Sequence, residues 1–419
     1  MRIGIDGGCL SNRRGFGRFA REMVRALAEA DSEHDFVVYL DRPSAERVAI
    51  PATMETAVVD VRVAPSVAAS STGRRSVRDM LAMGRAVARG GLDAIYFPAT
   101  YSFFPVWNAG RVVVTMHDTL ALAQPELVFP GGRGRLAWKV KEYAAALRAD
   151  RIVTVSESAR RDLAAWFRRP IEQIHVVTEG PAPAFGPVGD EAQADATLRR
   201  HGVDPATRFL LYVGGLSPHK NLERLIAAFG RTATGREVRL VIVGDFGDVF
   251  HTHADALVGL RDALGLGDRV LFPGFVPDAE LAHFYRRAYA LVQPSLMEGF
   301  GLPPVEAMAS GTPVLSSTAG SLPEVVGPAG LFFDPLQVDS MAATIARLLD
   351  DPAGRESLAN RALDRSGLFT WERSARLLLD CFAGLRPGVR SSPAGLRRSR
   401  QAAPAVAVSR RFPSGRSDA

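Results

Sequence analysis

The sequence predicts an α/β protein made of two Rossmann-like, doubly wound domains that face each other across a cleft. Short apolar runs of strand length alternate with helical segments in both halves of the chain. Several of these runs end in glycine-containing turns, which is typical of the strand ends where ligands of open α/β sheets bind. The length of 419 residues also suits two domains, each able to bury its own core.

Composition excludes several classes of protein. Hydrophobic residues make up 47% of the chain, yet no run of about 20 apolar residues predicts a membrane span. Cys9 and Cys381 are the only cysteines, so neither a disulfide framework nor a cysteine metal cluster is expected. The chain starts with a strand at once and shows no signal-peptide pattern, so we expect a cytoplasmic protein.

The net charge of +6 belongs to the tail. From Pro387 onward seven arginines stand against one aspartate, so residues 1–386 are formally neutral. The charge therefore does not indicate a nucleic-acid partner. The tail lacks apolar periodicity and is predicted to be disordered over 387–419.

The first domain is predicted to span 1–185 and the second 206–365, with a linker rich in proline and glycine at 186–205 between them. A last helix, within 366–386, follows the second domain. Strands are expected at 2–6, 36–40, 58–63, 93–97, 111–115, 151–155, 174–177, 209–213, 238–243, 270–272, 290–292, 312–316 and 331–334. Helices are expected from about residue 19, at 74–89 and 133–148, from residue 156, and at 303–311, 338–349, 354–365 and 371–385.

The most informative stretch is 290–311, a strand, a glycine-containing loop and a helix. The helix N-terminus carries partial positive charge and free N–H groups, so it suits an anion. Glu298 lies in the loop and Glu306 in the helix, and carboxylates only accept hydrogen bonds. Such a site suits a ligand with both phosphate and hydroxyl groups, such as a sugar nucleotide. An ordinary βαβ crossover with two solvated glutamates is the alternative.

This stretch resembles glycosyltransferase family 4, the retaining GT-B enzymes, including bacterial mannosyl, rhamnosyl and glucosyl transferases of the group 1 type. The matching pattern is Glu-x7-Glu from Glu298 to Glu306, followed by Ala307-Met308-Ala309 and Gly311. The resemblance covers nearly all of 1–386 and is most specific over 290–325. It implies the GT-B fold, in which the last helix returns to the first domain.

A second phosphate-binding pattern follows the strand at 209–213, where glycines precede a lysine at a helix start. The resemblance assigns Lys220 to the donor diphosphate, whereas a solvated lysine is the alternative. Many relatives carry an arginine where Gly215 stands here. Either another group such as Arg18 compensates, or Lys220 and backbone N–H groups hold the phosphates alone.

The resemblance also implies the other donor contacts. Glu298 would bind sugar hydroxyls and Glu306 the ribose, while one turn after a strand would meet the nucleobase. The remaining candidates for donor binding are Gly214, Gly244, Phe275, Val276, Gly299, Phe300, Gly301 and Leu302. Asp245 and Asp248 lack further ligands, so no metal and no cofactor are expected.

In the first domain, Gly15 and Gly17 belong to a glycine-rich loop at 7–18 that we expect to reach the donor or the acceptor. Dinucleotide binding is the weaker alternative, because these glycines come well after the strand and no third glycine opens the helix. His117 and Asp118 follow the strand at 111–115. The resemblance implies that His117 contacts the transferred sugar, and Asp118 either caps the next segment or orients the imidazole.

Ser156 is expected to cap a helix near the donor cleft. The helices at 74–89 and 133–148 carry arginines and lysines. Their basic faces are either simply solvated or, together with the tail, contact an anionic membrane surface at the inner face of the membrane.

The sequence therefore predicts a retaining glycosyltransferase with His117, Lys220 and Glu298 as its catalytic residues. It would move a sugar from a nucleoside-diphosphate-sugar donor to a carbohydrate or lipid-linked acceptor in cell-surface polysaccharide, glycolipid or related glycoconjugate synthesis. The alternatives are a phosphorylase or epimerase on the same scaffold, and a catalytically silent sugar-nucleotide binding protein.

Overall fold

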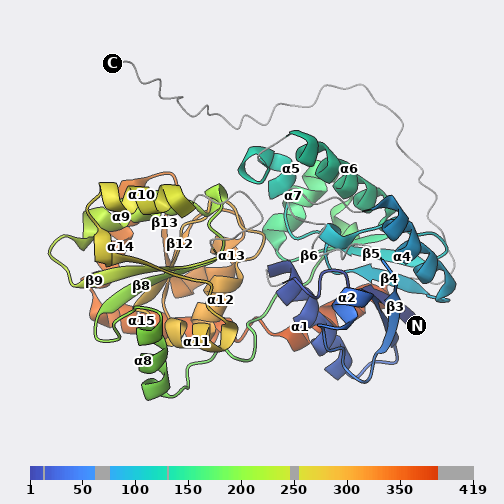
Figure 1. The fold of residues 1–419 in the computed structure, drawn as a ribbon, viewed down its shortest axis with the longest axis horizontal. Coiled ribbons are helices and arrows are strands. Elements are labelled where there is room, and N and C mark those ends of the chain that lie inside the picture. Colours follow the sequence, from blue (N-terminus) through green and yellow to red (C-terminus); the bar gives the residue numbers. More distant parts are fainter. Residues whose placement is uncertain (13–14, 62–75, 130–131, 246–253, 386–419) are drawn as a thin grey trace. The chain divides into compact units, whose positions relative to one another are not determined.

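The computed structural model of the chain describes residues 1–12, 15–61, 76–129, 132–245 and 254–385. Within them, two parallel sheets are each covered by helices (Figure 1). The predicted tail at 387–419 lies outside the described residues. None of the described helices combines the length and the apolar character needed to cross a membrane.

The N-terminal sheet has seven described strands in the order β3-β2-β1-β4-β5-β6-β7, all parallel. The order reverses between β1 and β4, which is the point where doubly wound sheets bind ligands. The strands are β1 (Arg2–Asp6), β2 (Asp35–Asp41), β3 (Glu55–Val59), β4 (Ala94–Phe97), β5 (Arg111–Thr115), β6 (Arg151–Thr154) and β7 (Ile174–Val176). The helices are α1 (Gly15–Glu29), α2 (Arg42–Ala45), α4 (Val77–Arg89), α5 (Leu120–Ala123), α6 (Gly132–Arg148) and α7 (Glu157–Phe167).

Both faces of this sheet are buried, which explains why its strands have continuous apolar sequences. One face packs against side chains of α4, α6 and α7, such as Met83, Ala145 and Leu163. The other face packs against α1. Helices on both faces are what the alternating strand and helix pattern predicted.

The C-terminal sheet has six described strands in the order β10-β9-β8-β11-β12-β13, again all parallel. Its order reverses between β8 and β11. The strands are β8 (Arg208–Val213), β9 (Val238–Val243), β10 (Val270–Gly274), β11 (Ala290–Gln293), β12 (Val314–Ser317) and β13 (Gly330–Phe333). The helices are α9 (Leu222–Ala233), α10 (Ala254–Ala263), α11 (Asp278–Arg287), α12 (Leu302–Ala309), α13 (Leu322–Val326), α14 (Val338–Leu349) and α15 (Pro352–Ser366).

The segment predicted as a linker, 186–205, contains a helix, α8 (Glu191–Arg200). Asp190 caps it by accepting a hydrogen bond from the backbone N–H of Gln193 at 3.0 Å. Ala194 and Leu198 are buried, and the helix packs against α11. The segment predicted as a linker thus includes a capped, half-buried helix between its proline and glycine residues.

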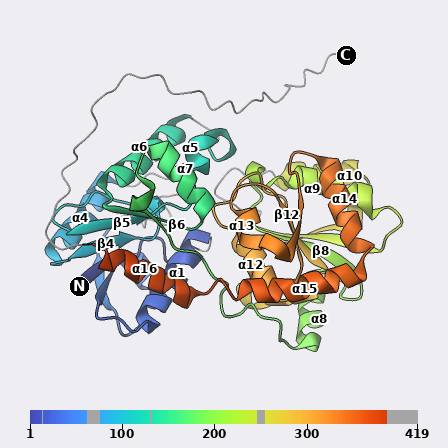
Figure 2. The ribbon, with the colours of Figure 1, turned by 180° about the vertical axis from the view of Figure 1, so that it is seen from behind.

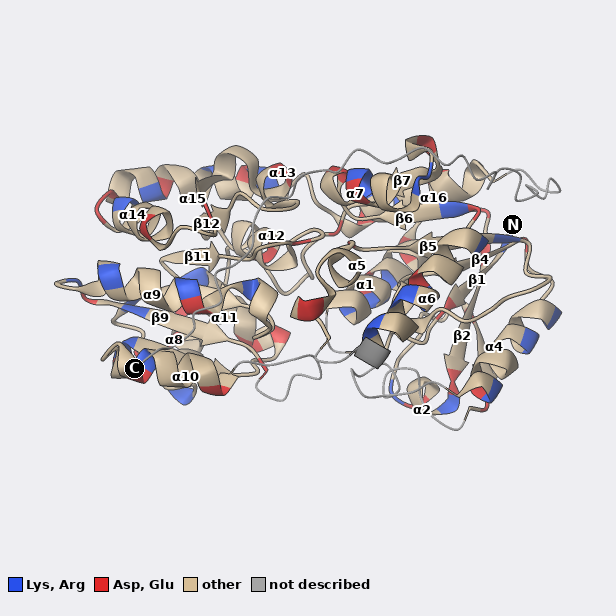
Figure 3. Ribbon diagram, turned by 90° about the horizontal axis from the view of Figure 1, so that it is seen from above, with Lys and Arg blue, Asp and Glu red and all other residues tan. Residues whose placement is uncertain are grey.

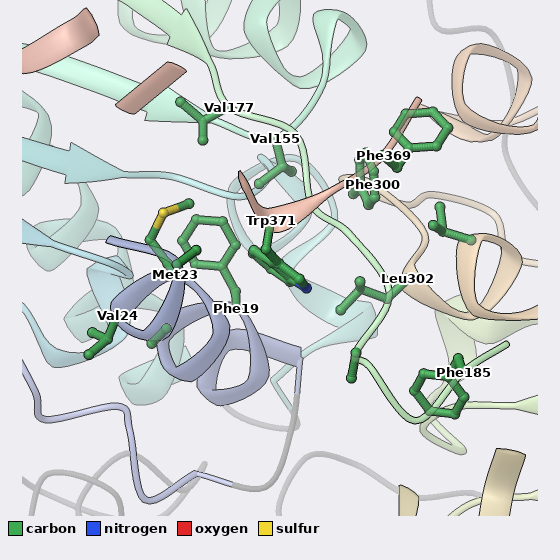
Figure 4. Close-up of a cluster of buried hydrophobic side chains, with 14 of the residues drawn as sticks. Phe19, Met23, Val24, Val155, Val177, Phe185, Phe300, Leu302, Phe369 and Trp371 are labelled. Atoms are coloured by element: carbon green, nitrogen blue, oxygen red, sulfur yellow. The ribbon is translucent and has the colours of Figure 1, made fainter. Parts of the chain in front are cut away.

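The last described helix, α16 (Trp371–Ala383), packs beside α1 (Figure 2). The rings of Trp371 and Phe19 meet edge to face, with centroids 5.8 Å apart (Figure 4). The Ser374 hydroxyl donates to the carbonyl of Thr178 at 2.5 Å. These contacts join the end of the described chain to its first helix.

Three predicted boundaries in the N-terminal half differ from the structure. The first helix begins at Gly15 instead of residue 19, so Gly15 and Gly17 lie inside its first turn. Strand β3 ends at Val59, whereas the prediction ran from 58 to 63, and residues 62–63 lie outside the described residues. The helix predicted from residue 74 is described from Val77. Glycine reads as a loop signal in a sequence, but packing can hold it in a helix.

Candidate active site

Lys220 and Glu298 meet at the point where the strand order of the C-terminal sheet reverses. Lys220 follows β8 and Glu298 follows β11, and these strands are neighbours. The Lys220 Nζ atom lies 2.7 Å from Oε1 of Glu298. Two groups 78 positions apart in sequence thus form one ion pair at the carboxyl ends of the strands.

The Glu298 carboxylate is held by more than the lysine. Its Oε1 also accepts hydrogen bonds from Nε2 of Gln293 and from the hydroxyl of Ser295, each at 2.7 Å. Burial alone would raise the pKa of Glu298, but the Lys220 ammonium and the Ser295 hydroxyl hold it below its ordinary value. The group is therefore an ionised acceptor in a nearly dry position.

The loop around Gly320 supports Glu298 from behind. The carbonyl of Glu298 accepts from the Ser321 N–H at 3.2 Å and from its hydroxyl at 3.0 Å. Gly320 has φ +60°, and a Cβ there would lie 2.6 Å from the Glu298 carbonyl oxygen. Glycine is needed at this position both for its conformation and for this close approach.

Three glycines end neighbouring strands of the same sheet. The N–H of Gly214 donates to the Val243 carbonyl, and that of Gly244 to the Gly274 carbonyl, each at 3.1 Å. A Cβ on Gly244 would lie 2.5 Å from the carbonyl oxygen of Gly214. These N–H groups already have acceptors, so Gly214 and Gly244 offer space rather than hydrogen bonds to a ligand.

Phe300 and Leu302 were expected to line the sugar pocket, but their side chains are buried in the hydrophobic core (Figure 4). The ring of Phe300 packs edge to face on Phe369, 5.5 Å between centroids. Their backbone is what remains for a ligand. Gly301, with φ +103°, turns the chain into the N-terminus of α12.

The turn after β10 places its two predicted base contacts differently. Phe275 is half exposed, whereas Val276 is buried in the core. Phe275 can therefore offer an aromatic face to a ligand. Val276 contributes at most its backbone.

Glu306 is fully buried and has partners on both carboxylate oxygens. Its Oε1 accepts from Arg18, and its Oε2 accepts from the Tyr285 hydroxyl at 2.8 Å. Arg18 also pairs with Asp278. Burial raises the pKa of Glu306, while the Arg18 charge opposes that rise. Arg18 thus pairs with Glu306, the residue predicted to bind the ribose, rather than joining Lys220 as a second phosphate-binding cation.

His117 lies at the end of β5, between two aromatic rings. Its ring centroid is 4.8 Å from those of Phe16 and Phe19. Nε2 lies 3.1 Å from the Pro98 carbonyl oxygen, and Nδ1 lies 3.4 Å from the carboxylate of Glu179. Both ring nitrogens thus lie near an oxygen of the chain, which fixes the orientation of the imidazole.

A pocket beside His117 contains two further acids. Its lining includes Asp118 and Glu142 with the aromatic rings of Phe16 and Trp138. Burial raises the pKa of Asp118. Its Oδ1 accepts a hydrogen bond from the Leu120 N–H at 2.8 Å, so Asp118 caps the next turn, which is one of the two roles expected for it.

Glu142 is the pocket residue that the sequence reasoning missed. Burial raises its pKa to about 7, although the Thr100 hydroxyl donates to its Oε1 at 2.5 Å and opposes the shift. In sequence it looks like a solvated residue in a basic helix. The available signal was that it is the single acid among the seventeen residues of α6.

Ser156, which follows β6, contacts the loop that follows β11. Its hydroxyl donates to the Gly299 carbonyl at 2.6 Å and accepts from the Ala159 N–H at 3.1 Å, which caps α7 as predicted. A Cβ on Gly299 would lie 2.5 Å from the His117 carbonyl oxygen. Gly299 thus brings the Glu298 loop against the strand that carries His117.

Gly15 and Gly17 lie in the first turn of α1, on either side of Phe16, which lines the pocket beside His117. Gly15 is exposed, and Gly17 is buried where a Cβ would lie 1.9 Å from the Asn12 carbonyl oxygen. Gly17 therefore serves the packing of the chain on itself. Across the described ranges, no three His, Cys, Asp or Glu side chains gather in a way that could hold a metal ion.

Two doubly wound sheets with their functional groups at the carboxyl strand ends define a GT-B enzyme, as predicted. Residues 194–365 match the family described as glycosyl transferases group 1, and residues 13–181 match glycosyltransferase family 4. The chain belongs to the group 1 type of glycosyltransferase family 4.

Two relatives illustrate the similarity in sequence. O-antigen chain mannosyltransferase B of Escherichia coli is 31% identical, over 67% of this chain and 72% of the relative. A D-inositol 3-phosphate glycosyltransferase of Frankia alni is 33% identical, over 70% of this chain and 75% of the relative. The match to the mannosyltransferase WbdA of Escherichia coli spans only 35% of that protein.

Solved structures show the same fold. Sucrose-phosphate synthase from Thermosynechococcus elongatus has a TM-score of 0.72 at 24% identity, covering 92% of this chain and 99% of that one. Anabaena HepE in complex with UDP-glucose has a TM-score of 0.68 at 19% identity, covering 92% of this chain and all of that one.

Proposed function

We propose that the protein is a retaining glycosyltransferase that moves a sugar from a nucleoside-diphosphate-sugar to an acceptor hydroxyl in polysaccharide, glycolipid or related glycoconjugate synthesis. The observation that carries this proposal is the ion pair of Lys220 and Glu298 at the reversal point of the C-terminal sheet. An ammonium suits the diphosphate, and an ionised carboxylate beside it accepts hydrogen bonds from sugar hydroxyls.

The names of similar proteins support the same chemistry. The relatives from Escherichia coli and Frankia alni are a mannosyltransferase and an inositol phosphate glycosyltransferase. The structure of HepE was solved with UDP-glucose. A nucleotide sugar is thus the donor class that we propose for this chain.

Departure of the diphosphate is the step that needs electrostatic help. Lys220 and the N-terminus of α12 after Gly301 supply positive charge on the same side of the sheet. Groups fixed in advance around developing charge often give the largest share of a rate enhancement. Glu298 holds the sugar in this scheme, and no covalent nucleophile is assigned.

The acceptor hydroxyl would lie in the pocket beside His117. The rings of Phe16 and Trp138 suit the apolar face of a sugar, and the carboxyls of Asp118 and Glu142 suit its hydroxyls. His117 lies close enough to this pocket to hold the sugar or receive a proton, with Glu179 behind it.

The test is release of nucleoside diphosphate from a panel of UDP-, GDP- and ADP-sugars, with and without carbohydrate acceptors. The unaltered protein should release it, and Glu298→Gln should lower the rate about 10²-fold or more. Glu356→Gln changes an exposed glutamate on α15 and should leave the rate unchanged. Retention predicts that NMR of the product shows the donor's anomeric configuration, and an inverted product would contradict it.

One observation keeps a silent binding protein as the second candidate. The family resemblance leads one to expect an arginine where Gly215 stands, so half of the expected phosphate clamp is missing. Tight binding of a nucleotide sugar without turnover against any acceptor would favour this candidate. Consumption of free phosphate, or interconversion of donors without an acceptor, would instead identify a phosphorylase or an epimerase.

A further inference from the structure

Helix α6 turns an apolar stripe to solvent. Leu136, Val140, Tyr143 and Leu147 are between 37% and 73% exposed. Their spacing of four, three and four residues places them on one side of the helix. With a rise of 1.5 Å per residue, the stripe is roughly 16 Å long.

The buried side of the same helix explains why its large apolar side chains face solvent. Ala145 and Ala146 pack against the sheet, and Glu142 faces the pocket. We expected the basic side of this helix to be either simply solvated or in contact with an anionic membrane surface. Small residues of α6 face the sheet, whereas Leu136, Val140 and Leu147 face outward. Tyr143, the least exposed member of the stripe, packs its ring edge to face on Phe167, 5.2 Å between centroids. Large apolar side chains gathered on an exposed face mark an interaction site.

Over residues 134–148 of α6 the exposed charge is basic, and the half-buried Arg148 pairs with Asp150 at 3.5 Å. From residue 134 onward, the exposed positions of α6 are apolar or, at Lys139, basic. Arg135 and Arg148 are half-buried towards its two ends. Figure 3 marks the Lys and Arg positions of α6 in blue. The single acid of the helix, Glu142, is buried on the opposite side. An apolar face with a basic rim is the pattern of helices that lie in the surface of a membrane.

We propose that the exposed stripe of α6 docks on an anionic lipid bilayer. Apolar side chains would enter the interface while Lys139 meets lipid phosphates. A second copy of this chain fits less well, because it would bring the same basic rim against this one. The basic tail has the same sign of charge and is disfavoured for the same reason.

Docking in this way would set the pocket beside His117 at the membrane surface. Trp138 and Glu142 line that pocket from the other side of α6. The preferred acceptor is then a sugar linked to a lipid, reached from the bilayer without leaving it. This last step rests on the proposed function, whereas docking itself does not.

The experiment is co-sedimentation of the full chain with two kinds of vesicle. One contains phosphatidylcholine alone, and the other also contains about 30% of the anionic lipid phosphatidylglycerol. We expect binding to the anionic vesicles only, weakened by salt. The double variant Leu136→Glu/Leu147→Glu should lower binding at least ~10-fold, because two large apolar groups no longer enter the interface.

The matched control is Val188→Glu/Leu336→Glu, which places acids at two exposed apolar positions away from α6 and should retain binding. Thermal unfolding should be alike in all three proteins. Unchanged vesicle binding in the α6 variant would overturn the proposal, as would a dimer in solution that the same variant dissociates. Because the assay contains no sugar, a failed transferase assay would not alter its outcome.

Discussion

The two halves share one sheet topology but surround their functional groups differently. In the C-terminal half, Lys220 and Glu298 form a hydrogen-bonded ion pair. In the N-terminal half, His117 lies between aromatic rings, and burial shifts the pKa of Asp118 and Glu142 toward the neutral form. Under the proposed function, the C-terminal half would hold the charged donor and the N-terminal half a neutral, hydroxyl-bearing acceptor.

The largest expected effect concerns the charged half. Lys220→Ala should lower kcat by ~10²–10³-fold if the ammonium acts on transition-state charge. Steady-state kinetics measure this, and Arg361→Ala, which removes an exposed arginine of α15, is the control with unchanged kcat. Unchanged turnover in Lys220→Ala would remove the distinction between the two halves.

The raised pKa of Glu142 makes a prediction for the neutral half. Its folded value of about 7 lies above the ordinary value of 4.5, so the folded state binds more protons between these pH values. The free energy of unfolding should therefore fall as pH rises through this window, by roughly 3 kcal/mol in total from this group.

Urea denaturation of the unaltered protein and of Glu142→Gln, at pH values of about 4.5, 6 and 7.5, measures this contribution as a difference in the free energy of unfolding. The curves should converge near the acid end and separate above it, with Glu142→Gln the more stable. Parallel curves would show that Glu142 is solvated. Glu356→Gln, at an exposed site, should follow the unaltered protein.

A pair of glycines tests packing in the N-terminal half. Gly17→Ala places a Cβ 1.9 Å from the Asn12 carbonyl oxygen, so the unfolding free energy should fall by about 2 kcal/mol. Gly15→Ala meets nothing within 4 Å and should be neutral or slightly stabilising. Equal urea midpoints for both variants would show that the close approach is absent.

The smallest effect concerns an acid of the C-terminal half that caps a helix of the N-terminal half. Glu324 accepts from the N–H groups of Glu157 and Ser158 at 2.9 and 3.0 Å. Glu324→Gln should cost about 1 kcal/mol of unfolding free energy, since the charge at the N-terminus of α7 is lost. Glu157→Gln alters an exposed ion pair and should cost less, about 0.5 kcal/mol or under. A larger loss in Glu157→Gln would contradict this ranking.

The sequence predicted the strands well, because buried parallel strands have continuous apolar runs bounded by turn residues. It also brought Lys220 and Glu298 into one proposed site, which the 2.7 Å contact places together. It did so because the family resemblance assigns both residues to the same donor; the structure adds that they follow neighbouring strands at the reversal point. The sequence could not show which oxygens and side chains of the site already form hydrogen bonds with other residues of the fold.

Glu306 and Glu142 show what a linear pattern omits. The partners of Glu306, Arg18 and Tyr285, lie 288 and 21 positions away, and only tertiary packing brings them together. Glu142 lies on the face of α6 that a basic, amphipathic reading would turn to solvent. Local propensity likewise placed Gly15 in a loop, although packing draws it into α1.

In both halves the side chains of the candidate site come from the loops and helices that follow the strands, and among those discussed above only Gln293, the last residue of β11, belongs to a strand. Each half can therefore exchange those segments without disturbing the sheet of the other. Chimaeras that join the first half of one relative to the second half of another should keep both folds, and each should inherit its donor preference from one parent and its acceptor preference from the other.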